Sequence, residues 1–342
     1  MRILIVKLSS MGDLFHTLPA VAEMAASCPG VSVDWLVDKQ FEDIPQWSRY
    51  INRTYSVPLR QLKKKNRRVN FLSIYRVLKS INANQYDVLI DAQGLLKSAL
   101  ISRLVSAKAR HGYDKDSIRE SLASCLYSRR HSVSRELHAI NRIRQLFSSV
   151  MGYSLNNQHP LNYGLHLLPE ATIPRDAPVL CFPCTTWATK HWPASAWRRL
   201  FELLADDCPR MQLAWGTDSE RKHVTELARG YSNVEILPSL NISEMTEYVR
   251  RARLIIGVDT GFTHLAQMFD IPLVAIYGAT APGKTGPMGA QQRILSASFP
   301  CSPCFKRECQ YNGPSIHRPA CYDSVSPLRV KQAVIDLLSS SH

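Results

Sequence analysis

The chain has 342 residues, of which 45% are hydrophobic and 20% charged, which is the composition of a soluble globular protein with room for two domains of ordinary size. No uncharged apolar run approaches the roughly 18 residues that a membrane span needs. The first apolar run is bracketed by Lys7 and Asp13 and is too short for a signal peptide, so we expect a cytoplasmic protein.

The net charge of +14 is concentrated in the first half of the chain. Residues 1–170 hold 24 Lys and Arg against 13 Asp and Glu, whereas residues 171–342 hold 18 against 15. Between Leu59 and Tyr86 there are eight basic residues and no acidic one. A solvated face, nucleic acid, anionic lipid head groups and a phosphorylated ligand would all explain this run, so charge alone predicts only an anionic partner for the first half.

The first half begins with a buried strand at residues 2–8, a turn at 9–13 and a helix at 14–26. Asp13 would lie at the carboxyl end of the strand, where open α/β sheets bind ligands, or it would serve as a helix N-cap. Strand and helix patterns then alternate, which predicts a parallel sheet. The expected strands are 31–37 and 86–91, and the expected helices are 71–82, 96–105, 117–127 and 135–151. Arg119 and Arg142 lie on the last two helices.

The stretch 152–178 has several Asn and Pro residues and little periodicity, so we place the domain boundary there. The alternation then restarts with a strand at 179–182, followed by a loop that contains Thr185, Thr186 and Lys190. Further strands are expected at 212–215, 234–237, 254–258 and 272–277, and further helices at 194–205, 217–229 and 243–251. The final amphipathic segment, 328–338, is expected to cross back over the first domain.

The segment LIIGVDTGFTHLA, residues 254–266, is the most informative stretch in the second half. Its pattern predicts a buried strand, a tight turn at Asp259, Thr260 and Gly261, and the start of a helix carrying His264. A helix N-terminus presents backbone N–H groups and a positive dipole end, which suits a phosphate, although many such turns only cap a helix. With Lys190 to neutralise a leaving group, the two loops could bind one diphosphate. Glu220 could accept hydrogen bonds from a ribose.

Two other patterns are weaker. Residues 278–285 match the phosphate-loop pattern G-x-x-x-x-G-K-[ST], but Gly286, Pro287 and Gly289 oppose the helix that should start at Lys284. We therefore expect an active-site loop there instead. The cysteines at 301, 304, 309 and 321 lack the paired knuckles of a typical zinc site, so reduced packing thiols, a structural metal and a regulatory disulfide all stay open, the first being favoured.

Five motifs in the same order resemble the ADP-heptose:lipopolysaccharide heptosyltransferases. They are KLSSMGD near the start, DAQGL at 91–95, TKHWP at 189–193, LAWG at 213–216 and GVDTGFTHLA at 257–266. The resemblance covers nearly the whole chain and is strongest for the enzymes that add the first heptose. It implies an α/β protein of GT-B architecture with two Rossmann-like doubly wound parallel-sheet domains facing a cleft. The expected limits are 1–165 for the acceptor domain, 166–325 for the nucleotide-sugar domain and 326–342 for the C-terminal helix.

The resemblance also implies roles for individual residues. Asp13 would be the general base and Lys190 would assist departure of the diphosphate. The donor would be held by residues of four loops, namely Thr185, Thr186, Lys190, Glu220, Leu240, Asp259, Thr260, Gly261 and His264. Basic residues of the first domain would contact the acceptor, namely Arg60, Lys64, Arg119 and Arg142. No metal and no cofactor would be required.

The implied reaction transfers L-glycero-D-manno-heptose, with inversion, from ADP-heptose to a Kdo residue of Kdo₂-lipid A. The enzyme would work as a peripheral protein on the cytoplasmic face of the inner membrane. A heptosyltransferase II or another nucleotide-sugar transferase of this fold is the alternative. A nucleic-acid-binding protein is disfavoured because aromatic residues are not interleaved with the basic run, and a phosphate-loop nucleotidase is a third possibility.

Overall fold

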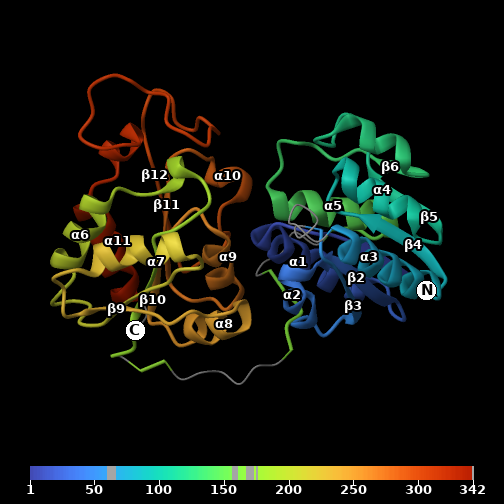
Figure 1. The fold of residues 1–342 in the computed structure, drawn as a ribbon, viewed down its shortest axis with the longest axis horizontal. Coiled ribbons are helices and arrows are strands. Elements are labelled where there is room, and N and C mark those ends of the chain that lie inside the picture. Colours follow the sequence, from blue (N-terminus) through green and yellow to red (C-terminus); the bar gives the residue numbers. More distant parts are fainter. Residues whose placement is uncertain (60–66, 156–160, 167–172, 175, 341–342) are drawn as a thin grey trace. The chain divides into compact units, whose positions relative to one another are not determined.

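The computed structural model describes residues 1–59, 67–155, 161–166, 173–174 and 176–340, with side chains described from residue 72 onward in the second of these ranges. The chain forms two compact units, Met1–Leu168 and Pro169–His342 (Figure 1). Each contains one six-stranded, fully parallel sheet. The α/β fold class expected from the sequence is therefore confirmed.

The first unit has the strand order β3-β2-β1-β4-β5-β6. Its strands are β1 (Arg2–Val6), β2 (Ser32–Asp38), β3 (Ile51–Val57), β4 (Tyr86–Asp91), β5 (Ala107–Tyr113) and β6 (Arg129–His131). Its helices are α1 (Met11–Ser27), α2 (Asp43–Gln46), α3 (Arg67–Asn82), α4 (Leu96–Leu104) and α5 (Ala139–Met151), with 3-10 turns η1 (Lys39–Phe41) and η3 (Ser121–Leu126). The expected helix at 117–127 is thus only a short 3-10 turn.

Central strand β1 is buried on both faces, as expected for a parallel sheet covered by helices. Leu4 and Val6 point into a cluster that also contains Ile81 of α3 and Ile101 of α4. Helices α1 and α5 pack against each other elsewhere on the sheet. Strand order reverses at β1 and β4, so this pair forms the topological switch point where ligands of such sheets bind.

The second unit repeats the architecture with the order β12-β11-β10-β7-β8-β9. Its strands are β7 (Val179–Phe182), β8 (Met211–Leu213), β9 (Val234–Ile236), β10 (Leu254–Val258), β11 (Leu273–Tyr277) and β12 (Gln292–Ser296). Its helices are α6 (Ala194–Leu203), α7 (Asp218–Ala228), α8 (Ile242–Arg250), α9 (Gly261–Met268), α10 (Pro282–Thr285) and α11 (Pro327–Ser340), with η4 (Ala188–Lys190) and η5 (Ala320–Ser324).

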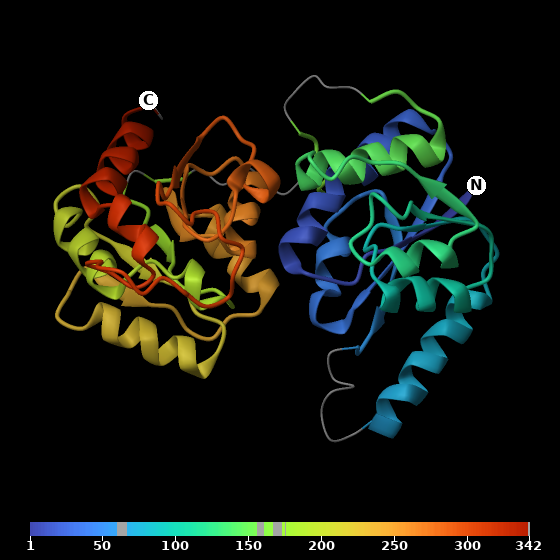
Figure 2. The same ribbon diagram turned by 90° about the horizontal axis from the view of Figure 1, so that it is seen from above.

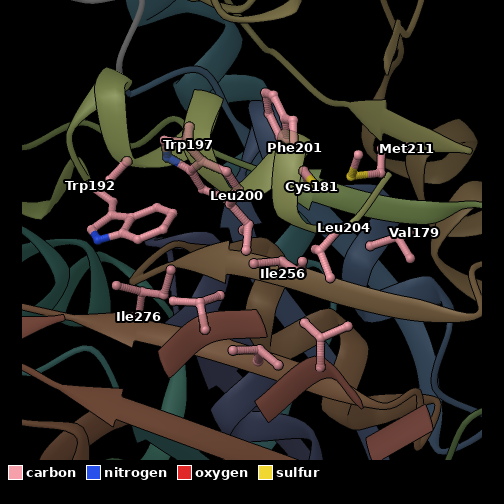
Figure 3. Packing of buried hydrophobic residues seen from close by; sticks show 14 of the residues in the cluster. Val179, Cys181, Trp192, Trp197, Leu200, Phe201, Leu204, Met211, Ile256 and Ile276 are labelled. Atoms are coloured by element: carbon pink, nitrogen blue, oxygen red, sulfur yellow. The ribbon is translucent and has the colours of Figure 1, made fainter. Parts of the chain in front are cut away.

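The core of the second unit is rich in aromatic residues. Trp192 and Trp197 meet edge to face with ring centroids 5.2 Å apart, and Phe201 extends the cluster toward β7 and β10 (Figure 3). The Trp192 indole N–H donates to the carbonyl of Val325, which fixes the loop before α11 to this core. The three rings come from one short segment, so they hold the loop after β7 in a defined place.

Helix α11 packs on α6 of the second unit. The Lys331 ammonium donates to the carbonyl of Leu203 and pairs with Asp207 at 2.8 Å. Helix α11 also contacts β11 and β12 of the same unit. The expectation that the final segment crosses back over the first domain stays a prediction.

The edge of the first sheet carries a histidine pair that predicts a pH dependence. The His111 Nδ1 and His131 Nε2 atoms lie 2.9 Å apart, and burial followed by the nearby His131 lowers the pKa of His111 to about 4. The unfolded chain, with an ordinary pKa of about 6.5, then binds more protons than the folded one between these values. Stability should therefore be fully present above pH 6.5 and fall as the pH drops toward 4, by about 1–2 kcal/mol once partial solvent exposure is allowed for.

Urea unfolding of the wild type at pH 7.5 and pH 5 measures this loss. In His111→Gln the part of the pH dependence due to His111 should disappear, whereas the smaller part due to His131, whose pKa is lowered by burial, should remain. An unchanged pH profile in that variant would contradict the account.

Candidate active site

In the second unit, three loops that follow neighbouring strands converge on Asp259. The Lys190 Nζ atom, from the loop after β7, lies 2.7 Å from Asp259 Oδ2. The Thr280 hydroxyl, from the loop after β11, donates to the same carboxylate oxygen. The Thr185 hydroxyl donates to the Asp259 backbone carbonyl at 3.1 Å. The carboxyl ends of β7, β10 and β11 are thereby tied into one cluster.

The ion pair in this cluster is largely shielded from water. The Asp259 and Lys190 side chains are 9% and 17% exposed. At such burial a charged group needs a partner, so each side chain holds the other in one position. Burial followed by the negative charge of Asp259 also raises the pKa of Tyr277, at the end of β11. Lys190 therefore presents a charge that is already oriented by Asp259.

Helix α9 starts two residues after Asp259. Thr260 is its N-cap in extended conformation, and within the described chain its side chain makes no capping hydrogen bond to the helix. The first N–H groups of α9 thus keep their capacity to bind an anion. Gly257 permits the close approach of α9 to β10, since a Cβ there would lie 2.7 Å from the Thr263 methyl carbon. His264 is buried in the first turn of α9.

An aromatic platform adjoins Lys190. The Trp187 ring has the Lys190 ammonium 4.7 Å and the Arg307 guanidinium 5.5 Å from its centroid. Thr189 is buried and binds the segment around Arg307 through its hydroxyl and through its N–H. Sequence reasoning missed Trp187, Thr280 and Arg307. Only Thr280 carried a signal, as the first polar side chain after the strand β11.

The remaining donor-side candidates follow the next strands of the sheet. The Glu220 carboxylate, in the first turn of α7, accepts a hydrogen bond from the Gly216 N–H at 2.9 Å. Leu240 is half-buried in the loop between β9 and α8. Thr186 is exposed. All the donor-side candidates therefore follow carboxyl ends of strands in one sheet, but only Thr185, Lys190 and Asp259 are linked by the contacts described above.

In the first unit, Asp13 occupies the first turn of α1. Ser10 is the N-cap, and its N–H and hydroxyl both donate to Asp13 Oδ2, at 2.9 and 2.7 Å. The second carboxylate oxygen lies 3.9 Å from Lys7 Nζ, and the Asp13 side chain is 42% exposed. Asp13 is therefore a member of a capping box rather than the N-cap itself. One oxygen remains open to an approaching group.

The DAQGL motif holds the loop before Asp13. The Gln93 side-chain carbonyl accepts the N–H groups of Leu8 and Ser9 at 2.9 Å each. The buried Lys7 ammonium donates to the carbonyl of Ala92 at 3.0 Å. The KLSSMGD and DAQGL motifs, which meet at the switch point, are thus joined by hydrogen bonds. Gln93 and Lys7 were missed as site-forming residues, although both lie inside motifs that the sequence had singled out.

Arg142, one of the expected acceptor contacts, is held beside an aromatic ring. Its guanidinium lies 5.1 Å from the ring centroid of Tyr113 and donates to the carbonyl of Ser117 at 2.6 Å. Burial raises the pKa of Tyr113, and the negative charge of Asp13 acts in the same direction. Arg119 is exposed after β5. Arg60 and Lys64 lie outside the described residues.

The competing motifs do not form sites in the described residues. Helix α10 ends at Thr285 instead of starting at Lys284, which is the opposite of a phosphate loop. All nine cysteines are free, and in the described chain no group of three or more His, Cys, Asp or Glu side chains is arranged to hold a metal ion. Burial, followed by Cys301, Cys304 and Cys309, raises the pKa of Cys321 to about 12. None of the described helices is long and apolar enough to cross a membrane.

Comparison with known proteins decides between the functional classes that the sequence left open. The model of "Glycosyltransferase family 9 (heptosyltransferase)" matches residues 74–314, well over half of the chain. The chain belongs to this family. It is therefore a glycosyltransferase, and the nucleic-acid-binding and nucleotidase alternatives fall away.

Individual relatives show which members of glycosyltransferase family 9 the chain resembles. Lipopolysaccharide heptosyltransferase 1 of Pseudomonas aeruginosa is 39% identical over 96% of both chains. The enzyme of the same name from Escherichia coli K12 is 36% identical over 87% of this chain and 94% of its own. The structure of E. coli heptosyltransferase WaaC with ADP matches with a TM-score of 0.85 and 34% identity, covering 98% of this chain and all of that one. The chain is thus similar to type 1 heptosyltransferases along its whole length.

The Lys190–Asp259 pair of this family 9 enzyme gives a stability prediction. Lys190→Met and Asp259→Asn should each destabilise the second unit, because each leaves the partner charge buried and unpaired. The double variant should lose less than the sum of the two, with a coupling free energy of about 0.5–3 kcal/mol. Urea unfolding of the four proteins measures this coupling.

Arg229→Met and Glu226→Gln provide the matched control, since this exposed pair has a similar separation of 2.8 Å. Its coupling should stay below about 1 kcal/mol. Additive effects at Lys190 and Asp259 would show that the pair is not the organising contact.

Proposed function

We propose that the chain transfers L-glycero-D-manno-heptose from ADP-heptose to Kdo of Kdo₂-lipid A, in the assembly of the lipopolysaccharide inner core. The observation that carries this proposal is its similarity to type 1 heptosyltransferases over 96% of the chain. The solved relative with ADP-2-deoxy-2-fluoro heptose, 33% identical, supports ADP-heptose as the donor. The acceptor, the inversion and the peripheral location on the cytoplasmic face of the inner membrane are parts of the proposal.

The second unit would bind the donor. Its diphosphate would meet the N–H groups at Thr260 and Gly261, with Lys190 neutralising the charge that develops as ADP leaves. Asp259, enclosed and already paired, would orient Lys190 rather than act as a base. Thr185, Thr186 and His264 would add donors to the phosphates, while Glu220 and Leu240 would line the adenosine.

The first unit would bind the acceptor and supply the base. In the reaction the acceptor hydroxyl oxygen attacks the anomeric carbon of heptose from the face opposite the diphosphate. The new C–O bond forms, the bond to the diphosphate oxygen breaks, and the hydroxyl proton passes to the open oxygen of Asp13. This direct displacement uses no covalent nucleophile. Because Lys190 and the N–H groups at the start of α9 would neutralise the leaving diphosphate, we expect no dependence on a metal ion. Arg60, Lys64, Arg119 and Arg142 would attract the anionic acceptor.

The test is transfer from ADP-heptose to Kdo₂-lipid A lacking heptose, with ADP release and product mass measured and a parallel assay in EDTA. Transfer that is undiminished by EDTA is the expected result. Transfer only to an acceptor that already carries one heptose would replace the proposal with a heptosyltransferase II activity. ADP binding without transfer to either acceptor would refute both acceptors.

The role of Asp13 gives a sharper prediction. Asp13→Ala should lower kcat by about 10²- to 10⁴-fold, the usual contribution of a general base, while ADP affinity stays unchanged because the donor binds the other unit. Transfer rates and ADP calorimetry on the same preparations measure the two effects.

Ser10→Ala is the matched control. It removes the hydroxyl that donates to Asp13 Oδ2 but leaves the carboxylate in place. Activity of Asp13→Ala within a few-fold of Ser10→Ala would rule out the proposed base.

A further inference from the structure

Helix α4 presents large apolar residues to solvent. Leu96, Leu100 and Leu104 recur at intervals of four and are 38%, 51% and 60% exposed. The side toward the protein contains the buried apolar residues Ala99 and Ile101 together with Ser98 and Ser102, which are fully buried and donate their hydroxyls to the backbone carbonyls of Leu95 and Ser98. An ordinary surface helix has charged and polar residues on its outer side.

The 3-10 turn η3 extends this apolar strip. It packs against α4, and its Leu122 is 72% exposed. We call Leu96, Leu100, Leu104 and Leu122 the leucine face. Of the eleven large hydrophobic side chains that are exposed in the described chain, four belong to the leucine face, and Leu72 and Tyr75 lie on α3.

Helix α3 borders the leucine face. The Asn82 side chain, at the end of α3, donates to the carbonyl of Leu104 and accepts the N–H of Ser106. In Figure 2, α3 extends outward from the rest of the first unit, and its C-terminal end lies beside α4. Both helices also share the buried cluster under them, so their outer sides belong to one surface.

The charges on these two helices are all of one sign. Lys97 and Arg103 flank the leucines of α4, and Arg76 and Lys79 are exposed on α3. Neither helix contains an acidic residue. Glu120, next to η3, is occupied in accepting the N–H of Leu96 at the start of α4. The apolar strip therefore lies in a positive field.

The exposed leucines and the positive charges together indicate which partner the leucine face binds. In a symmetric dimer the same patch would meet itself, which would bring the cations of two copies together around a buried apolar strip. A nucleic acid would match the charge but would not use the leucines. A bilayer with anionic lipids matches both, because leucines insert at the acyl boundary while Lys and Arg remain among the phosphates.

We propose that the leucine face docks the enzyme onto an anionic phospholipid bilayer, with Lys97 and Arg103 at the level of the lipid phosphates. This inference deepens the function proposed above and rests on it only for the biological reason to bind a membrane, namely a lipid-linked acceptor. The surface itself follows from the contacts and exposures of α3, α4 and η3.

The test is co-sedimentation of the full chain with vesicles of equal parts phosphatidylglycerol and phosphatidylcholine. The triple variant Leu96→Gln, Leu100→Gln, Leu104→Gln keeps good helix formers at every position. Its partition coefficient should fall at least tenfold, since burying even one leucine contributes about that factor. The control Ile316→Gln, Leu328→Gln changes two exposed apolar residues of the second unit and should bind as the wild type does.

The contribution of the basic residues is tested with Lys97→Gln and Arg103→Gln. Each should weaken binding about fivefold at low salt, and wild-type binding should weaken on vesicles of phosphatidylcholine alone. Equal vesicle binding by the wild type and the triple variant would overturn the proposal, as would a wild type that does not bind. A concentration-dependent dimer that the triple variant abolishes would assign the leucine face to a second copy instead.

Transfer assays separate this inference from the proposed function. With acceptor embedded in vesicles the triple variant should be at least tenfold slower than wild type, whereas with an acyl-free acceptor saccharide the two should be equal. Equal loss on both acceptors would show damage to the active site and contradict a docking role. If the wild type transfers to neither acceptor but still binds vesicles through the leucine face, the function fails while the docking surface stands.

Discussion

The buried ion pair between Lys190 and Asp259 is the contact on which the second unit's site depends. It joins the loop after β7 to the loop after β10, and the Thr280 hydroxyl brings in the loop after β11. Without it, two buried charges would lack partners and the three loops would lose their common fixed point. The pair therefore explains both why the start of α9 is held in place and why Lys190 is available as an oriented charge beside it.

The first unit places a lysine and an aspartate at the corresponding edge, with a different outcome. Lys7 is buried and bound to the carbonyl of Ala92, so its contact with Asp13 stretches to 3.9 Å. Asp13 keeps 42% of its side chain exposed, where Asp259 keeps 9%. An enclosed carboxylate suits orientation of a cation, and an accessible one suits acceptance of a proton. The same pair of residue types thus supports two different roles, separated by burial.

Strands with short apolar runs were predictable from the sequence, and β4, β7 and β10 have the expected limits. Short or polar strands such as β5, β6 and β12 were not, because their pairing comes from the sheet and not from their own residues. The donor-side loops could be located, since chemistry-bearing residues follow strand ends. The contacts between the loops could not be predicted, because they join segments far apart in sequence. Examples are the contacts of Thr280 with Asp259, of Arg307 with Trp187 and of Gln93 with the loop before Asp13.

The most direct test of the account is a crystal structure of the chain with ADP. The account predicts that the β-phosphate lies within hydrogen-bond distance of backbone N–H groups at the start of α9 and of Lys190, with Lys190 still paired to Asp259. A nucleotide bound elsewhere, or one that leaves Lys190 and the start of α9 without a phosphate contact, would contradict it.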